Sequence, residues 1–237
     1  MSVIWHDVEC GAYAEDISLW RSLAAEHSDP ILDVGAGTGR VALDLARRGH
    51  RVTALDSDPV LIAELARRGR GLDVTPVVAD AREFVLGQRF ALCIVPMQTI
   101  QLLGGEQGRR AFLSCARRHL RAGGSLAVAV APMLELFEVV EGAPGPVPDI
   151  REVDGVVYSS LPTAVRADRD GFLLERRRER ISGSGERTVA DDVIRLDRLS
   201  GAQIEFEAIG AGLRPVGHLT VAPTPDYVGS DVVMLRA

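Results

Sequence analysis

One acidic residue and three alternating glycines form the stretch with the clearest chemical potential. Asp33 lies in an apolar segment at 31–34 and is followed by Gly35, Gly37 and Gly39. Glycine adopts backbone angles that a side chain forbids, and its missing Cβ lets a ligand lie against the main chain. A helix that begins just after these glycines would add unpaired N–H groups at its positive end. The pattern therefore predicts a nucleotide-binding turn between a first strand and a first helix.

The spacing of the glycines bears on which nucleotide would bind. A dinucleotide-binding turn has the pattern G-x-G-x-x-G. Here the third glycine comes one residue early, at Gly39, and Arg40 takes the expected position. A carboxylate at Asp33 attracts an ammonium group and repels a pyrophosphate. The residues thus favour a nucleoside that carries a cationic group. A NAD site with an irregular loop and a glycine turn without a ligand are the alternatives.

A second acid ends the next apolar segment, at 51–56. Asp56 comes 17 residues after Gly39, and an acid at this strand end can hydrogen-bond both ribose hydroxyls of a nucleoside. Ser57 and Asp58 follow, and Asp58 precedes a proline, as a helix N-cap often does. We therefore expect Asp56 to contact the ligand and Asp58 to cap the next helix.

The next two apolar segments also end in residues suited to a nucleoside. Asp80 can accept a hydrogen bond from an adenine amino group while the N–H of Ala81 meets a ring nitrogen. Capping of a short turn is the alternative for Asp80. Met97 follows the second segment, and a thioether packs well against a flat ring.

These candidates must be positioned by alternating strands and helices. Apolar runs predict strands at 31–34, 51–56, 74–80, 90–96 and 125–131, and helical patterns predict helices at 40–48, 59–68 and 106–121. This alternation is typical of a doubly wound parallel sheet, whose ligand lies over the carboxyl ends of the strands. A helical pattern at 16–26 precedes the first strand, and we expect it to lie across this opening as a lid.

The order of these motifs resembles that of a known family. Asp33 with its three glycines, Asp56, the pair Asp80-Ala81, the strand that ends at Pro96 and the stretch RAGGSLAVAV occur in the order found in class I S-adenosylmethionine-dependent methyltransferases. The resemblance covers residues 10–132. It implies a Rossmann-like, seven-stranded mixed α/β sheet with the last strand antiparallel. Segments 211–219 and 231–237 would supply the final two strands, after a helix at 200–210.

The resemblance also implies a cofactor and its contacts. The cofactor would be S-adenosyl-L-methionine, with S-adenosyl-L-homocysteine as the product, and no metal is expected. The expected cofactor contacts are Tyr13, Asp33, Gly35, Ala36, Gly37, Gly39, Asp56, Ser57, Asp80, Ala81 and Met97. Trp5, Gln98 and Gln101 are candidate substrate contacts, although Trp5 and Tyr13 would alternatively only pack the lid. No catalytic residue is assigned, because no His/Asp pair identifies a general base.

An insertion is expected after the fifth strand. A loop rich in proline and glycine at 133–149 leads into alternating runs that are separated by Asp-Gly and Ser-Gly steps, which are hairpin signals. We expect a small antiparallel sheet at about 151–199 that covers the acceptor pocket or forms an interface. The predicted division is a lid at 1–28, a cofactor domain at 29–148 and 200–237, and an insertion at 149–199. Arg176, Arg178 and Arg180 share one strand face, which would hold an anionic substrate or pair with neighbouring acids.

Composition narrows the function further. The net charge of −6 provides no basic field for a nucleic acid, and all 27 basic residues are arginine. The sequence contains no lysine and no asparagine, which excludes a Schiff-base lysine, a Walker lysine and an asparagine-led base-methylating motif. Three cysteines without paired or metal spacing indicate free thiols in a reducing cytoplasm. No segment is suited to a signal peptide or to a membrane span.

The sequence thus predicts a cytoplasmic enzyme that methylates an O, N or C atom of a small molecule. It would act as a monomer or homodimer, without nucleic-acid or membrane partners. A nucleic-acid or protein methyltransferase and a non-catalytic or repurposed S-adenosylmethionine-binding protein are the alternatives.

Overall fold

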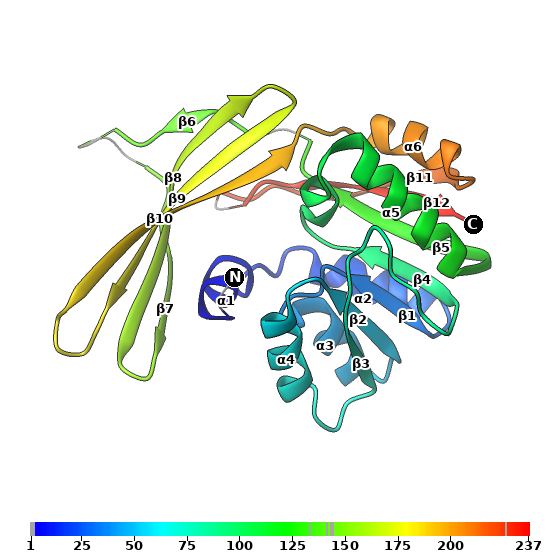
Figure 1. Cartoon of the computed structure of the whole chain (residues 1–237), viewed down its shortest axis with the longest axis horizontal. Coiled ribbons are helices and arrows are strands. Elements are labelled where there is room, and N and C mark those ends of the chain that lie inside the picture. The colour runs from blue at the N-terminus through cyan, green and yellow to red at the C-terminus, as the bar shows by residue number, and fades with distance from the viewer. Residues whose placement is uncertain (1–2, 133, 141, 143–144, 226) are drawn as a thin grey trace.

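Two separate β-sheets organise the chain, and the short helix α1 (Val3–Cys10) lies between them (Figure 1). The computed structural model describes residues 3–132, 134–140, 142, 145–225 and 227–237. The larger sheet carries the motifs found in the sequence, and the smaller sheet is formed by the segment that follows β5 (Leu120–Val130).

The larger sheet has seven strands in the order β11-β12-β5-β4-β1-β2-β3. The strands from β1 to β5 pair in parallel, whereas β12 is antiparallel to both of its neighbours. The strands besides β5 are β1 (Ile31–Val34), β2 (Val52–Asp56), β3 (Val74–Val78), β4 (Phe90–Val95), β11 (Arg214–Val221) and β12 (Ser230–Arg236). This is the mixed seven-stranded sheet that the sequence predicts, with its predicted antiparallel last strand.

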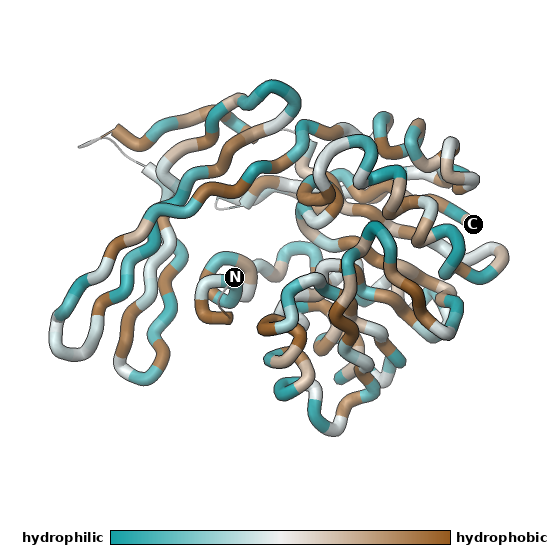
Figure 2. Tube along the Cα trace, in the orientation of Figure 1, coloured by the Kyte–Doolittle hydropathy of each residue, from teal (hydrophilic) through white to brown (hydrophobic). Residues whose placement is uncertain are grey.

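Helices cover both faces of this sheet, which explains why β1 and β4 are buried throughout and, apart from Asp33, apolar. One core cluster joins the sheet to α2 (Ile17–Glu26), α3 (Arg40–Arg47) and α4 (Pro59–Arg68), and the other joins it to α5 (Gly105–His119) and α6 (Gly201–Gly210). Figure 2 shows the hydrophobic colour concentrated along the strands of this sheet.

The predicted helix at 16–26 forms, but it does not lie across the opening of the sheet. Trp20, Leu23 and Ala24 of α2 are buried in the core cluster beside α3. Trp20 also donates a hydrogen bond of 2.8 Å to Asp16. The position expected of the lid helix is instead taken by α1, which contacts the second sheet and α4. The sequence pattern does not predict a helix at the position of α1.

The second sheet is antiparallel throughout and has the strand order β10-β9-β8-β6, with β7 also paired to β8. Its strands are β6 (Phe137–Glu138), β7 (Asp149–Val153), β8 (Val156–Asp168), β9 (Gly171–Ile181) and β10 (Arg187–Asp197). A separate antiparallel sheet is therefore present where the sequence predicts one. These strands carry both hydrophilic and hydrophobic stretches (Figure 2), and six charged residues follow one another at 175–180 of β9.

A buried ion cluster fixes the point where the second sheet returns to the first. Arg109 of α5 donates to Glu207 of α6 at 2.9 and 2.7 Å and to Asp197, the last residue of β10, at 2.8 Å. All three side chains are at most 5% exposed. Each charge has an opposite partner, as buried charges require.

Candidate cofactor site

Four of the predicted residues meet at the carboxyl edge of the larger sheet. Asp33 lies near the end of β1, Asp56 ends β2, Asp80 follows β3 and Met97 follows β4. These strands are neighbours in the order β4-β1-β2-β3. The crevice outside the carboxyl ends of parallel strands is where such folds bind ligands, so the topology brings the separate motifs to one place.

The glycine turn between β1 and α3 has a backbone that only glycine adopts easily. Gly35 and Gly37 have φ angles of 74° and 54°. A Cβ on Gly37 would lie 2.2 Å from Nε2 of His6, and a Cβ on Gly35 would lie 2.5 Å from the Thr99 side chain. The glycines thus let α1 and the segment after β4 approach the main chain of the turn. Ala36 is buried, and Gly39 precedes α3 with a φ of 97°.

Asp33 is a buried carboxylate whose two oxygens have no hydrogen-bond partner among the described residues. The residue is only 1% exposed. Burial raises the pKa of Asp33 to about 7, although Arg40 opposes the shift. An unpaired buried carboxylate is costly, and the ammonium group of S-adenosylmethionine is a partner of the right charge. The site therefore fits this cofactor at Asp33.

Asp56 bonds the backbone of the glycine turn, and Asp58 caps α4 as the sequence predicts. Asp56 accepts hydrogen bonds of 2.9 Å from the backbone N–H groups of Gly37 and Asp58, and it is half-buried. Asp58 accepts from Val60 at 2.8 Å and caps α4. Ser57 is exposed. The two backbone hydrogen bonds fix the orientation of the Asp56 carboxylate, which is the group proposed to meet the ribose.

Asp80 makes local contacts in this structure. It accepts hydrogen bonds from the backbone N–H and from Nε of Arg82 at 2.8 and 2.9 Å. The bond from the Arg82 side chain lowers the pKa of Asp80. This is the turn-capping arrangement that was the alternative for Asp80, with an ion pair added. Ala81 beside it is buried, and the adenine contact of both residues stays a prediction.

The segment after β4 contains one strained residue and one that differs from expectation. Met97 has a φ of 55°, which is uncommon for a residue other than glycine and concentrates at functional sites. Gln98 is half-buried. Gln101, predicted to face the acceptor, is 1% exposed, and its amide bonds Ala131 N, Ala131 O and Asp197 O at 2.9, 3.2 and 2.9 Å. These bonds connect the segment of Gln101 to the backbone at Ala131 and Asp197. The amide is therefore used within the protein, and Gln101 does not serve as a substrate contact here.

The two N-terminal aromatic candidates lie in different places. Tyr13 is buried beneath the guanidinium of Arg40, 5.1 Å from its ring centre, and beside the ring of Tyr227 at 5.1 Å. Trp5 lies edge-on to Tyr158 of β8 at 5.5 Å. Tyr13 thus belongs to the side of the larger sheet, whereas Trp5 faces the second sheet.

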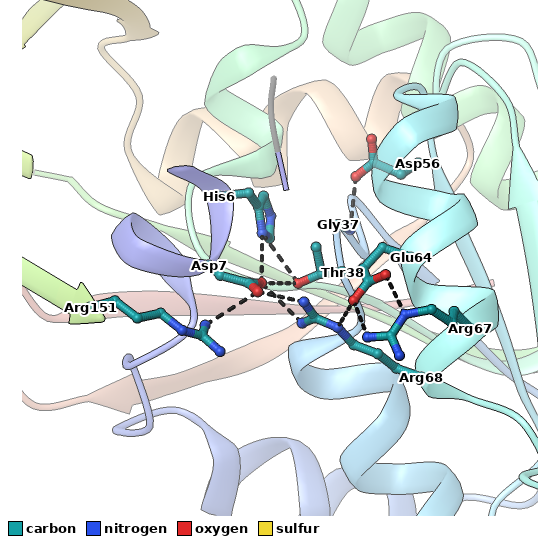
Figure 3. Close-up of polar contacts among 9 residues, drawn as sticks. All are labelled: His6, Asp7, Gly37, Thr38, Asp56, Glu64, Arg67, Arg68 and Arg151. Carbon is teal, nitrogen blue, oxygen red and sulfur yellow. Dashed lines mark hydrogen bonds and ion pairs between the residues drawn. The ribbon is translucent and has the colours of Figure 1, made fainter. Parts of the chain in front are cut away.

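His6 of α1 lies at the glycine turn. Its ring lies over Gly37, with Nδ1 3.4 Å from Oγ1 of Thr38 (Figure 3). Burial lowers the pKa of His6, despite the nearby carboxylates of Asp7 and Asp56. No local sequence pattern could have found it, because its neighbours are distant in the chain.

The remaining histidines are engaged in contacts of their own. They are His27 with Ser125, His50 with Asp29, His119 with the N–H of Leu86, and His218 with Asp231 and Glu205.

Within the described ranges, no group of three histidine, cysteine or carboxylate residues is arranged to hold a metal ion. None of the helices that the structure describes is both long and apolar enough to cross a membrane.

Comparison with known proteins identifies a methyltransferase domain within the chain. Residues 31–124 match a family described as a methyltransferase domain. The probable cobalt-precorrin-6B C(15)-methyltransferase (decarboxylating) of Methanothermobacter thermautotrophicus is 36% identical over 119 residues, which are 48% of this chain and 58% of that protein. The chain thus spans just over half the length of this relative.

Two solved structures have the same fold over nearly the whole chain. The sugar N-methyltransferase KedS8 from Streptoalloteichus has a TM-score of 0.75 at 19% identity and covers 98% of this chain and 90% of its own. The S-adenosylmethionine-bound amino pentose methyltransferase CalS10 from Micromonospora echinaspora has a TM-score of 0.73 at 20% identity, with coverages of 99% and 97%.

The larger sheet with its helices forms a Rossmann-like α/β fold, and residues 31–124 within it match the methyltransferase-domain family. This agrees with the motif order, which resembles that of class I S-adenosylmethionine-dependent methyltransferases, and one of the similar structures has S-adenosylmethionine bound.

Proposed function

We propose that the protein transfers a methyl group from S-adenosylmethionine to an oxygen, nitrogen or carbon atom of a small molecule. The observation that carries the proposal is the buried carboxylate of Asp33 beside the glycine turn, which has no hydrogen-bond partner in the part of the chain that the structure describes. An adenosyl sulfonium compound carries an ammonium group that would satisfy it, whereas a pyrophosphate would be repelled.

The proposed residues bind and align the reactants. Asp33 holds the ammonium group, Asp56 the ribose hydroxyls and Met97 one face of the adenine. S-adenosylmethionine supplies a methyl group on a positively charged sulfur, which departs as a neutral thioether. Because this leaving group is good, alignment and exclusion of water are the main tasks of the protein. An acceptor that bears an extra proton would also have to release it, and no side chain is assigned to that step.

A small amine is the first acceptor class to test. The two structural neighbours are named for an amino pentose and for a sugar nitrogen. The face of the second sheet near α1 carries both signs of charge: Asp149 and Asp192 lie with Glu9 of α1 around Arg176 and Arg178. One carboxylate oxygen of Asp192 and two nitrogens of Arg176 are buried without a hydrogen-bond partner among the described residues, so this face offers polar groups to an acceptor.

A non-catalytic S-adenosylmethionine-binding protein is the second candidate. It is favoured by the histidines, each of which has a hydrogen-bond partner within the protein, so that none stands out as a general base. Radiolabelled methyl donor, incubated with panels of amino sugars, amines, phenols and carboxylates, distinguishes the two. Label transfer to a small molecule supports the enzyme. Binding of the donor without transfer to any panel supports the second candidate.

A further inference from the structure

One carboxylate links α1 to three other parts of the molecule. Asp7 accepts a hydrogen bond of 2.7 Å from Thr38 of the glycine turn and one of 3.0 Å from Arg68 of α4 (Figure 3). Arg151 of β7 approaches its other oxygen to 3.2 Å. The side chain of Asp7 is only 3% exposed. Burial alone would raise the pKa of Asp7, but the bonds from Arg68 and Thr38 lower it below its ordinary value.

The contact between α1 and β7 depends on this ion pair more than on packing. A hollow of about 260 Å³ separates the two elements and is lined by Asp7, Val8, Gly11, Ala12, Ile150 and Arg151. Ile150 is 64% exposed, so its side chain does not fill the hollow. The Asp7–Arg151 pair therefore spans a region in which apolar contact is sparse.

A second set of contacts joins the other side of α1 to β8 and β9. Glu9 accepts hydrogen bonds from Ser160 at 2.9 Å and from Arg178 at 2.7 and 2.9 Å. The Arg178 guanidinium also lies 5.5 Å from the ring centre of Trp5. The second sheet thus holds α1 at two points, at Asp7 and at Glu9.

The same helix forms part of the cofactor site. His6 precedes Asp7, and its ring covers Gly37, whose N–H is bonded to Asp56. The ring is 15% exposed, so most of its surface is covered by the protein. Any displacement of α1 would move this ring away from the turn.

We propose that Asp7 is a positioning residue that holds α1 against both the glycine turn and the second sheet. Helix α1 would then form part of the cofactor site on one side and contact the second sheet on the other. This inference rests on the proposed function, because it assigns the crevice to S-adenosylmethionine. We call Asp7 and its three partners the latch. Thr38 and Arg68 are its partners beside the cofactor site, and Arg151 is its partner on the second sheet.

The latch makes cofactor affinity depend on the docked fraction of α1. Apparent affinity falls in proportion to the population of the binding-competent state. If loss of the Asp7 charge leaves α1 docked in about one molecule in ten, the Kd for S-adenosylmethionine rises about tenfold. Cofactor bound against His6 would in turn stabilise α1 in its position on the glycine turn. Through the Asp7–Arg151 pair it would also reduce the local opening of β7.

The test compares Asp7→Asn with Asp44→Asn. Asp44 of α3 binds Arg21 of α2 at 2.8 and 2.6 Å and Arg48, which follows α3, at 3.4 Å. Both variants therefore lose a carboxylate that pairs with two arginines, but only Asp7 belongs to α1. Calorimetry with S-adenosylmethionine is expected to show about a tenfold rise in Kd for Asp7→Asn and an unchanged Kd for Asp44→Asn. Equal Kd values in the two variants would overturn the proposal.

Arg151→Gln tests the link to the second sheet without changing a buried residue, since Arg151 is 47% exposed. In the unaltered protein, hydrogen exchange is expected to slow in both α1 and β7 when S-adenosylmethionine is added. In Arg151→Gln the slowing is expected to persist in α1 and to disappear in β7. Retained slowing in β7 would contradict the latch. Failure of the unaltered protein to bind S-adenosylmethionine would instead overturn the proposed function.

Discussion

The carboxylate of Asp56 accepts a hydrogen bond of 2.9 Å from the backbone N–H of Gly37. This bond ties the end of β2 to the glycine turn that follows β1, two segments 19 residues apart. The other oxygen of Asp56 is held by the N–H of Asp58. A residue proposed to bind the ribose is therefore oriented before any ligand arrives, which reduces the entropy lost on binding.

Replacement of Asp56 and Asp58 should separate ligand binding from helix capping. Asp56→Ala removes acceptors for the ribose, and we expect the Kd for S-adenosylmethionine to rise about 10- to 100-fold, the value of hydrogen bonds to a charged group. Asp58→Ala removes the α4 cap at a cost of about 1 kcal/mol in the free energy of unfolding, with little change in Kd. Calorimetry and urea denaturation measure the two effects. Equal rises in Kd would show that the wrong acid was assigned.

Asp33→Asn should stabilise the ligand-free protein while it weakens cofactor binding. The folded-state pKa of Asp33 is raised from 3.8 to about 7, so the folded protein holds its proton more tightly than the unfolded chain. Stability is therefore lost as the pH rises from about 4 to about 7 and is level above that range. We expect Asn to remove this loss and to add about 1–3 kcal/mol to the free energy of unfolding at pH 8.

Cofactor titration of the same variant provides the second half of that test. The Kd of the unaltered protein should fall as the pH rises through about 7, because only the charged Asp33 attracts an ammonium group. Asp33→Asn should bind more weakly at pH 8 and lose this pH dependence. A variant that binds as tightly as the unaltered protein would remove Asp33 from the site.

Loss of an arginine from the buried ion cluster should lower the free energy of unfolding far more than loss of an arginine from a surface pair on the same helix. Arg109→Met leaves Glu207 and Asp197 without their buried partner, and we expect the free energy of unfolding to fall by about 3–5 kcal/mol. Arg110→Met breaks an exposed pair with Glu106 and should cost about 0.5 kcal/mol or less. Denaturant unfolding of both variants checks the contrast, and similar losses would contradict the role given to the cluster.

His218 should contribute stability only at low pH. Hydrogen bonds to Asp231 at 2.7 Å and Glu205 at 3.1 Å raise the pKa of His218 above 6.5. The folded state thus binds the proton more tightly, so the contribution is complete below pH 6.5 and vanishes as the pH passes the folded pKa. His218→Gln should lose less than about 1 kcal/mol at pH 6, because the ring is partly exposed, and nothing at pH 9. An NMR titration midpoint at or below 6.5 would refute this.

The larger sheet and its strand-end residues could be predicted from the sequence, because the motifs that indicate them lie next to the strands concerned. Asp33, the glycines and Asp56 each lie next to the strand that positions them, and the parallel topology then brings them to one edge. Hairpin signals likewise predicted the antiparallel sheet after β5, since a turn specifies its two neighbouring strands.

The parts that the sequence did not predict depend on contacts between distant segments. Asp7 of α1 meets Thr38, Arg68 and Arg151, which are 31 or more residues away, and an eight-residue helix has little stability of its own. Gln101 resembled a substrate contact because its neighbour Met97 follows a strand, but its amide bonds to segments 30 and 96 residues away. Local pattern carries no information on such pairings.

The central claim is that the glycine turn and the acids at the strand ends bind an adenosyl sulfonium compound. Its most direct test is calorimetric titration of the unaltered protein at pH 8 with S-adenosylmethionine and, separately, with NAD. We expect saturable binding of S-adenosylmethionine at one site per chain and no heat of binding with NAD. Binding of NAD in its place, or no binding of S-adenosylmethionine, would contradict the account.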